Sequence, residues 1–260
     1  MEITETPVAL TIATSDSGGG AGIQADLLTF RQCNCFGVSA FAALTAQNPE
    51  GVSAIHELPP EFLQAQLMQL IDYFPIRAAK TGMLFSDSLI RTTAAFIREN
   101  EIPLVVDPVM VSTSGARLLQ EDAIQTLKQE LLPLATLITP NLDEAGVLLG
   151  QRPETIEDME SATQTLARDY GTAVLLKGGH LASDQIQDLL VSADGKMERI
   201  SSTRIHGVDT HGSGCTLSAA ITANLANGQG MANAVRSGHA FLTEGMRHPV
   251  VIKGRAFIRR

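Results

Sequence analysis

Tryptophan is absent from this 260-residue chain, and only 4% of its residues are aromatic. No apolar run reaches the roughly 18 residues that a membrane-spanning helix needs, and the start, Met1-Glu2-Ile3-Thr4-Glu5, lacks the basic and then apolar order of a signal peptide. The three cysteines are too few for a disulfide scaffold and odd in number, which indicates a reducing compartment. We therefore expect a soluble cytoplasmic protein with no membrane partner.

Basic residues are also scarce. Nineteen Lys and Arg stand against 28 Asp and Glu, which gives a net charge of −9. Nucleic-acid binding needs clustered basic residues, so we expect no nucleic-acid partner. A phosphorylated ligand is not excluded, because local hydrogen-bond donors rather than net charge build such a site. The hydrophobic fraction of 44%, with 18% charged residues, is enough for a large buried core.

Short apolar runs alternate with longer segments of helical period, which is typical of parallel βαβ units. We predict one α/β domain over residues 1–260, a three-layer α/β/α fold with a mainly parallel central sheet. The predicted strands are 8–13, 38–43, 52–57, 76–81, 104–106, 137–139, 173–176 and 186–191. The predicted helices are 20–32, 60–74, 87–100, 121–132, 143–149, 156–170, 213–227 and 231–243.

Residues 36–58 break this alternation. Two strand-like runs flank Gln47-Asn48-Pro49-Glu50-Gly51 with no helix between them. The pattern is compatible with a small β flap over a site and equally with two ordinary edge strands.

The segment Gly212-Ser213-Gly214-Cys215 stands where the helix 213–227 is predicted to begin. Unpaired backbone N–H groups and the helix dipole make such a start an anion site. The two glycines allow close approach of a ligand, and a thiol in the first turn can become more acidic. This pattern indicates a phosphate site with a reactive side chain beside it.

Other polar residues follow the predicted strands, at the edge of the sheet where ligands bind in open parallel sheets. Asp107 and Glu144 could hold Mg²⁺, and Lys177 could neutralise a phosphate. The alternative is that such carboxylates only begin helices, and Asn141 is a good N-cap for the helix 143–149. The glycines 18–20 could simply form a tight turn. Neither a dinucleotide-binding nor a P-loop glycine pattern is present, so an ordinary P-loop ATPase is not expected.

Seven blocks in order resemble the hydroxymethylpyrimidine/phosphomethylpyrimidine kinases of the ribokinase-like superfamily. They extend over about residues 10–230: Thr11-Ile12-Ala13 with Ser15-Asp16 and Gly19-Gly20-Ala21-Gly22-Ile23-Gln24-Ala25-Asp26, Ala43-Leu44-Thr45-Ala46-Gln47-Asn48, Lys80-Thr81-Gly82-Met83-Leu84, Asp107-Pro108-Val109-Met110-Val111, Thr139-Pro140-Asn141-Leu142 with Glu144-Ala145, Lys177-Gly178-Gly179-His180 and Thr210-His211-Gly212-Ser213-Gly214-Cys215-Thr216.

The resemblance implies phosphorylation of 4-amino-5-hydroxymethyl-2-methylpyrimidine to its monophosphate and then to the pyrophosphate, with ATP and Mg²⁺, in thiamine biosynthesis. It implies that Asp107 and Glu144 organise Mg²⁺, and that the amides of Gly212, Ser213 and Gly214 form an anion hole. A homodimer is also implied, with residues 35–44 as a candidate contact. The implied substrate residues are Gln47, Gly22, Asp26, Gly82, Met83 and Val109, and the implied ATP residues are Lys177, Asn141 and Thr210.

Cys215 stands where many sugar kinases of the superfamily carry a catalytic aspartate. It could accept the substrate hydroxyl proton as a thiolate, or it could merely pack in the first helical turn. The chain departs from the family pattern at Thr14, Gly18, Leu28, Asp209 and Ser213, and residues 244–260 do not match strongly. A pyridoxal kinase on the same scaffold and a non-catalytic binder of a vitamin precursor are the alternatives.

Overall fold

The computed structural model describes residues 5–110, 119–179 and 184–260. Val111 and His180, which belong to the blocks quoted above, lie outside the described residues, as do residues 1–4. Within the described chain no helix is both long and apolar enough to cross a membrane.

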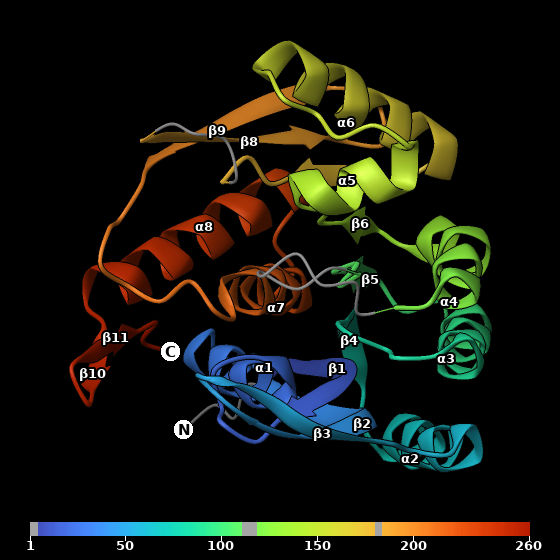
Figure 1. The fold of residues 1–260 in the computed structure, drawn as a ribbon. Helices are drawn as coiled ribbons and strands as arrows, with labels where there is room; N and C mark the ends of the chain where they lie inside the picture. Colours follow the sequence, from blue (N-terminus) through green and yellow to red (C-terminus); the bar gives the residue numbers. More distant parts are fainter. Residues whose placement is uncertain (1–4, 111–118, 180–183) are drawn as a thin grey trace.

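A nine-stranded sheet forms the centre of the molecule, in the order β3-β2-β1-β4-β5-β6-β7-β8-β9 (Figure 1). Strands β1, β2, β4, β5, β6 and β7 are parallel, whereas β3, and β8 with its neighbours, pair antiparallel. The strands are β1 (Val8–Asp16), β2 (Phe36–Asn48), β3 (Gly51–Glu57), β4 (Ile76–Thr81), β5 (Leu104–Val106), β6 (Leu137–Ile138), β7 (Ala173–Leu176), β8 (Gln185–Val191) and β9 (Met197–Thr203), with a separate pair β10 (Val250–Ile252) and β11 (Arg255–Phe257).

Helices cover both faces of the sheet, so the predicted three-layer arrangement is confirmed. One layer contains α1 (Gly22–Gln32), α7 (Ser213–Ala226) and α8 (Met231–Arg247). The other contains α2 (Pro60–Tyr73), α3 (Asp87–Asn100), α4 (Glu121–Thr126), α5 (Leu142–Leu149) and α6 (Ile156–Tyr170).

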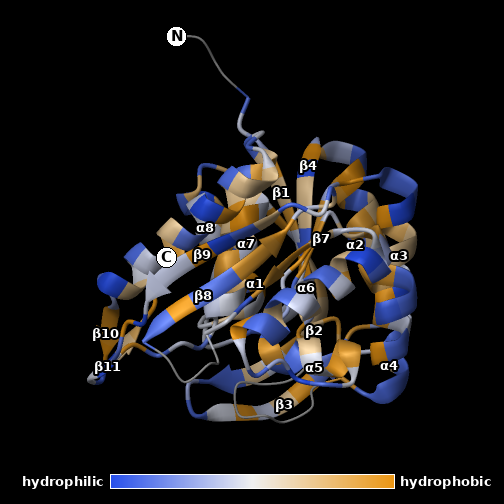
Figure 2. Ribbon diagram, turned by 90° about the horizontal axis from the view of Figure 1, so that it is seen from above, coloured by the Kyte–Doolittle hydropathy of each residue, from blue (hydrophilic) through white to orange (hydrophobic). Residues whose placement is uncertain are grey.

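Strand β5 illustrates why these residues form a doubly covered sheet. Successive side chains of a strand point to opposite faces. Leu104 and Val106 pack with the layer of α2 to α6, whereas Val105 packs against α7 and α8. A strand that is apolar at every position can therefore bury both of its sides. Figure 2 shows the same property in β7, which is coloured as hydrophobic along its length.

Two elements differ from the sequence-based expectations. The single helix predicted over 121–132 is wrong: α4 ends at Thr126, and the chain continues as a π turn at Leu127–Leu131 and a 3₁₀ turn at Leu132–Leu134. Pro133 has no N–H to donate and cannot sit inside a regular helix. Strand β9 was not expected, because its sequence Met-Glu-Arg-Ile-Ser-Ser-Thr has too few apolar residues for a clear pattern.

The segment 36–58 forms a hairpin. Strand β3 pairs antiparallel with the second half of β2, from Ala43↔Glu57 to Asn48↔Gly51, and every residue of β3 is exposed. Strand β3 is the edge of the sheet, whereas β2 lies between β3 and β1, so only one of the two strands is an edge strand. The turn of the hairpin extends beyond the end of β1, which brings Gln47 to the edge where the predicted site residues gather.

Candidate active site at the carboxyl edge of the sheet

The start of α7 has the geometry of an anion site. Gly212 adopts φ +77°, and a Cβ there would lie 1.8 Å from the Gly20 carbonyl oxygen, so only glycine fits. The Ser213 N–H donates to the Thr210 carbonyl (3.0 Å), whereas the N–H groups of Gly214 and Cys215 have no acceptor among the described residues. Two free amides therefore point outward at the positive end of the helix dipole. We call residues 212–215 the anion turn.

Lys177 and Asp107 form an ion pair beside the anion turn. Lys177 Nζ lies 3.1 Å from Asp107 Oδ1, and Thr139 Oγ1 donates to the same oxygen (3.3 Å). A Cβ at Gly214 would lie 3.4 Å from Lys177 Nζ and 3.5 Å from Asp107 Oδ2, so the lack of a side chain brings the three groups together. Burial alone would lower the pKa of Lys177, but the carboxylates of Asp107 and Glu144 outweigh it and raise that pKa, which keeps the ammonium charged.

Gly178, the residue after Lys177, holds the backbone next to this lysine in place. Gly178 donates its N–H to Asp188 Oδ1 (2.7 Å), and a Cβ at Gly178 would lie 1.9 Å from the Gln187 carbonyl oxygen. The close approach of β8 therefore requires glycine at this position. The hydrogen bond to Asp188 ties the residue after Lys177 to β8.

Asn141 and Glu144 form a capping box at the start of α5. Asn141 Oδ1 accepts from the N–H groups of Asp143 and Glu144 (2.9 Å each), and Glu144 Oε2 accepts from the Asn141 N–H (2.8 Å). The helix-cap alternative for Asn141 is thereby confirmed. Because Oδ1 already accepts two hydrogen bonds, only the side-chain nitrogen of Asn141 is left to donate a hydrogen bond to ATP.

The donor set suits Mg²⁺. Burial, together with the nearby Asp107 carboxylate, raises the pKa of Glu144 to about 8, although Lys177 acts in the opposite direction. Two buried carboxylates at one edge are poorly compensated by a single ammonium and would be stabilised by a dication. No cluster of three or more His, Cys, Asp or Glu able to hold a metal occurs among the described residues. The two carboxylates Asp107 and Glu144 fit Mg²⁺, because this ion uses few protein ligands and keeps waters and phosphate oxygens.

Cys215 lies near a buried ion pair that the sequence analysis did not assign. Lys80 Nζ lies 2.8 Å from Asp26 Oδ1, both side chains are fully buried, and Thr11 Oγ1 donates to Asp26 Oδ2 (2.7 Å). Burial raises the pKa of the Cys215 thiol, even though Lys80 and a hydrogen bond from the Gly22 N–H favour the thiolate. The expectation of a more acidic thiol in the first turn is therefore wrong for the ligand-free protein.

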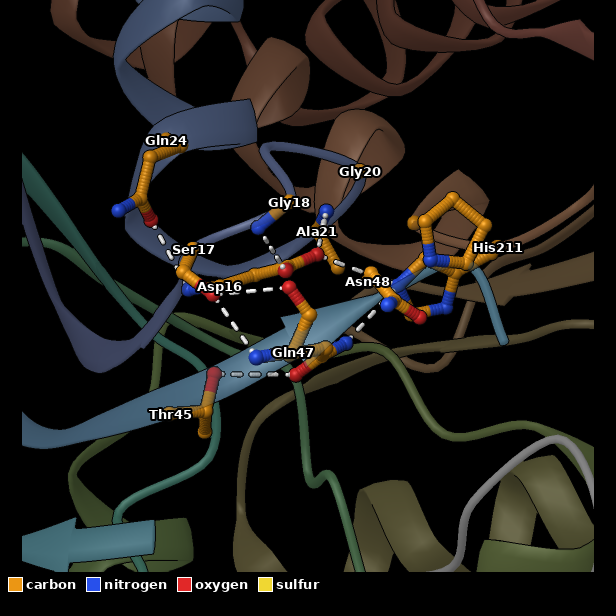
Figure 3. A network of polar contacts seen from close by, with 12 residues as sticks. Asp16, Ser17, Gly18, Gly20, Ala21, Gln24, Thr45, Gln47, Asn48 and His211 are labelled. Atoms are coloured by element: carbon orange, nitrogen blue, oxygen red, sulfur yellow. Dashed lines mark hydrogen bonds and ion pairs between the residues drawn. The ribbon is translucent and has the colours of Figure 1, made fainter. Parts of the chain in front are cut away.

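Gln47 belongs to a polar network that includes His211, the residue before the anion turn (Figure 3). Its Oε1 accepts from Thr45 Oγ1 (3.2 Å), and its Nε2 lies 3.2 Å from His211 Nε2. The same ring nitrogen of His211 lies 3.3 Å from Asp16 Oδ2. One ring nitrogen cannot accept from Gln47 and donate to Asp16 together, so the tautomer of His211 selects its partner.

Asp16 holds the loop that follows β1. Its carboxylate accepts from the N–H groups of Gly18 and Ala21 (2.8 Å each). Burial would raise the pKa of Asp16, but the bonds from His211, Gly18 and Ala21 outweigh it and lower that pKa. Gly19, with φ +73°, donates to the Asp16 carbonyl (2.9 Å), so the glycine run does form a tight turn.

The other residues expected around the substrate lie at the same edge. A Cβ at Gly22, where φ is +58°, would lie 2.4 Å from the Thr14 carbonyl oxygen. A Cβ at Gly82 would lie 3.1 Å from the Cβ of Ala13. Met83 and Val109 are half-buried. Asp26 is fully buried and bonded to Lys80 and Thr11, so it supports this edge from within.

Two departures from the family pattern find local partners. Thr14 Oγ1 donates to the Met83 carbonyl (2.9 Å). Asp209 Oδ1 accepts from the His211 N–H (2.9 Å), and Asp209 Oδ2 forms a 2.6 Å ion pair with Arg255, though not in hydrogen-bond geometry. The extra negative charge of Asp209 is thus neutralised within the chain. An open cavity of about 600 Å³ adjoins these residues and is lined by Thr210 and by 253–256.

Sequence reasoning assigned no role to Lys80, His211 or Arg260, which all reach this edge. A lysine directly after Ala78 and Ala79 in β4 was the available signal for Lys80. His211 lies inside a quoted block, and its role depends on the approach of the hairpin β2–β3, which no local pattern reveals. Arg260 comes from the segment that matched the family weakly.

The sheet, the anion turn and the Lys177–Asp107 pair together define a ribokinase-like kinase. The chain belongs to the family described as phosphomethylpyrimidine kinase, which matches residues 16–257. It is 44% identical over 247 residues to the hydroxymethylpyrimidine/phosphomethylpyrimidine kinase of Haemophilus influenzae, a match that covers 94% of this chain and 92% of the relative.

Solved structures agree with this placement. A crystal structure of phosphomethylpyrimidine kinase from Clostridium difficile is 38% identical, with a TM-score of 0.82, and the match covers 92% of this chain and 98% of that one. The structure of an ADP complex of Bacillus subtilis pyridoxal kinase is 35% identical with a TM-score of 0.90, and the match covers 98% of this chain and 97% of that one.

Proposed function

We propose that this chain transfers the γ-phosphoryl group of ATP to the hydroxymethyl group of 4-amino-5-hydroxymethyl-2-methylpyrimidine, and then phosphorylates the monophosphate to the pyrophosphate, as in thiamine biosynthesis. One observation carries the proposal, in a chain of this family. Lys177 Nζ lies 3.1 Å from Asp107 Oδ1, and a Cβ at Gly214 would lie 3.4 Å from the same nitrogen. A cation, a carboxylate and free amides are groups on which phosphoryl transfer depends.

Lys177 and the free amides of Gly214 and Cys215 act on the phosphates of ATP. The negative charge that accumulates on the transferring group is stabilised by donors that are already in place and need no rearrangement. Asp107 and Glu144 would hold Mg²⁺, which neutralises phosphate charge when bound. Thr210 and the cavity beside it receive the rest of the nucleotide, because this opening adjoins the anion turn.

The substrate hydroxyl oxygen forms its bond to the γ-phosphorus while the bond to the ADP oxygen breaks, and the hydroxyl proton passes to Cys215. Cys215 can accept it only as the thiolate. Lys80 and the Gly22 N–H are the groups that favour this form. In the alternative role Cys215 only packs in the helix, and positioning with charge stabilisation supplies the catalysis.

Gln47 is the hydrogen-bonding partner that we assign to the pyrimidine ring, with Gly22, Gly82, Met83 and Val109 around it. The carboxamide offers both a donor and an acceptor to a heteroaromatic ring. The hairpin β2–β3 acts as the flap over this ring, within a single kinase domain of residues 1–260. We place the enzyme in the cytoplasm, consistent with three free cysteines.

A homodimer formed through the outer side of this hairpin is also proposed. The large apolar side chains of Phe36, Leu44 and Ile55 are exposed there. Large apolar side chains that are exposed favour association of two copies, because the contact would cover them. Light scattering of the purified protein tests this directly, and a monomer mass at working concentration would contradict it.

Phosphorylation of pyridoxal is the second candidate activity, because the pyridoxal kinase structure has the higher TM-score of the two solved relatives. The test is incubation of the protein with Mg-ATP and each alcohol separately, with ADP release and product mass as readouts. A phosphorylated pyrimidine supports the leading proposal. Phosphorylated pyridoxal alone supports the second, and the absence of ADP with both alcohols indicates a non-catalytic binder.

A further inference from the structure

The segment after α8 returns to the active site. Residues 250–257 form the β10–β11 hairpin, and Ile258 is buried. The Arg259 N–H donates to the Gly245 carbonyl (3.0 Å), and a Cβ at Gly245 would lie 2.3 Å from the Arg259 carbonyl oxygen. Packing against α8 therefore fixes the backbone just before Arg260, which lies beyond the residues that match the family.

The guanidinium of Arg260 connects two loops of the site. Arg260 Nε donates to Thr216 Oγ1 (2.7 Å), in the first turns of α7. Arg260 Nη2 donates to the Gly20 carbonyl (2.7 Å) and also lies 3.3 Å from the Gly212 carbonyl. Gly20 belongs to the loop between β1 and α1, whereas Gly212 begins the anion turn. A rigid, planar fork of donors suits this bridging geometry.

The two loops approach each other so closely that they need such a bridge. A Cβ at Gly212 would lie only 1.8 Å from the Gly20 oxygen and 2.6 Å from Arg260 Nη2. Two carbonyl oxygens that converge without a donor repel each other, and a shared cationic donor offsets that repulsion. The same guanidinium places a positive charge near Cys215 and Asp16, although it is itself half-buried.

We propose that Arg260 is a positioning residue for phosphoryl transfer, which holds the loop at Gly20 against the anion turn. This inference rests on the proposed kinase function. The Gly20 loop continues into Gly22, whose N–H faces Cys215, and the anion turn carries the amides for the phosphate. Loss of the bridge separates the two halves of the site without removing any group that touches the substrate.

The test compares Arg260→Ala with Arg259→Ala, which removes the same charge from an exposed neighbouring side chain. We expect kcat to fall about tenfold to a hundredfold in Arg260→Ala, the cost of lost charged hydrogen bonds. The KM for the alcohol should change less, and Arg259→Ala should behave as wild type. Added guanidinium at a non-denaturing concentration should restore part of kcat in Arg260→Ala and have no such effect in Arg259→Ala.

Hydrogen–deuterium exchange of the ligand-free proteins gives a readout independent of activity. Exchange should rise in peptides that cover 17–22 and 210–216 in Arg260→Ala, and not in Arg259→Ala. If Arg260→Ala does not fold, Arg260→Lys takes its place. Its kcat should fall less than that expected for Arg260→Ala, because the positive charge remains. Its kcat should still lie below that of the wild type, because the planar set of donors is lost. Equal kcat in the two alanine variants, or faster exchange with unchanged kcat, overturns the positioning role. An inactive wild-type protein would instead contradict the kinase proposal.

Discussion

The ammonium group of Lys80 lies 2.8 Å from the Asp26 carboxylate, and neither side chain is exposed to solvent. Burial would lower the pKa of Lys80, but Asp26 and the neighbouring Cys215 and Asp107 outweigh it and raise that pKa. The pair therefore holds an ammonium group inside the protein, within electrostatic reach of the proposed base. Thr11 completes the hydrogen bonding of Asp26.

Removal of one partner of this pair should destabilise the protein. Lys80→Met leaves the Asp26 carboxylate buried without its counter-charge, and we expect the free energy of unfolding to fall by about 3–5 kcal/mol. Denaturant unfolding measures it. The exposed Lys196→Met is the control and should have little effect. The double variant Lys80→Met with Asp26→Asn should recover part of the loss, and equal stability of Lys80→Met and wild type would contradict the account.

Cys215→Ala should lower kcat by about 10²–10⁴ with little change in the KM of the alcohol, if the thiolate accepts the hydroxyl proton. Because burial raises the pKa of Cys215, the thiol is protonated at neutral pH and the thiolate fraction grows as the pH rises. The logarithm of kcat in the wild type should thus still increase above about pH 8.5, where an ordinary cysteine is already half ionised.

The control for this pH profile is Cys33→Ala, since Cys33 has no place in the site. Its profile should match that of the wild type, whereas the profile of Cys215→Ala should lose the rise at high pH. A near-normal kcat in Cys215→Ala would leave only the packing role for this residue.

Lys177→Met should lower kcat by about 10²–10³, because it removes a donor that acts on the charge of the transferring group. Steady-state kinetics with Lys196→Met as the matched surface control measure it. Chelation of Mg²⁺ from the wild type should also abolish turnover, and addition of Mg²⁺ should restore it. Turnover that persists without a divalent cation would contradict the assignment of Asp107 and Glu144.

Glu144 should make the stability of the metal-free protein depend on pH. Its pKa is raised by burial to about 8 in the folded protein, from an ordinary value near 4.5, so the folded state binds the proton more tightly than the unfolded state does. The stabilisation is therefore complete below about pH 4.5 and is lost as the pH rises toward 8. Mg²⁺ should restore stability at pH 8.

Glu144→Gln isolates this effect, because a glutamine oxygen can still accept the Asn141 N–H of the capping box. The melting temperature of the wild type should fall relative to that of Glu144→Gln between pH 5 and pH 8 without Mg²⁺. Each kcal/mol corresponds to about 2–4 °C in a protein of this size. Parallel pH profiles of the two proteins would show that Glu144 is not the group responsible.

Most of the sheet could be predicted from sequence because its strands are apolar on both sides. Leu104–Val106 and Ala173–Leu176 have the predicted bounds, since runs of buried residues are bounded by polar turns. Strand β9 could not be predicted, because an edge strand with one solvated face has a weak pattern. The helix predicted over 121–132 keeps α geometry only to Thr126, and the chain then passes through a π turn into the 3₁₀ turn that contains Pro133.

The candidate site was accessible to sequence reasoning wherever a residue follows a strand. Asp107 and Lys177 meet because they follow the parallel strands β5 and β7 at one edge of the sheet, and Gly214 joins them from the start of α7. The acidity of Cys215 was not accessible, since it depends on burial and on the distant Lys80. The contacts of His211 with Asp16 and Gln47, and of Arg260 with Gly20, join segments far apart in sequence and follow only from the fold.

The most direct test of the central claim is a competition. The wild-type protein is given equal concentrations of the hydroxymethylpyrimidine and of pyridoxal with limiting Mg-ATP, and the products are followed by mass spectrometry. The account predicts that the pyrimidine monophosphate forms first and that the pyrophosphate follows, with little pyridoxal phosphate. Predominance of pyridoxal phosphate, or no phosphorylated product of either alcohol, would contradict it.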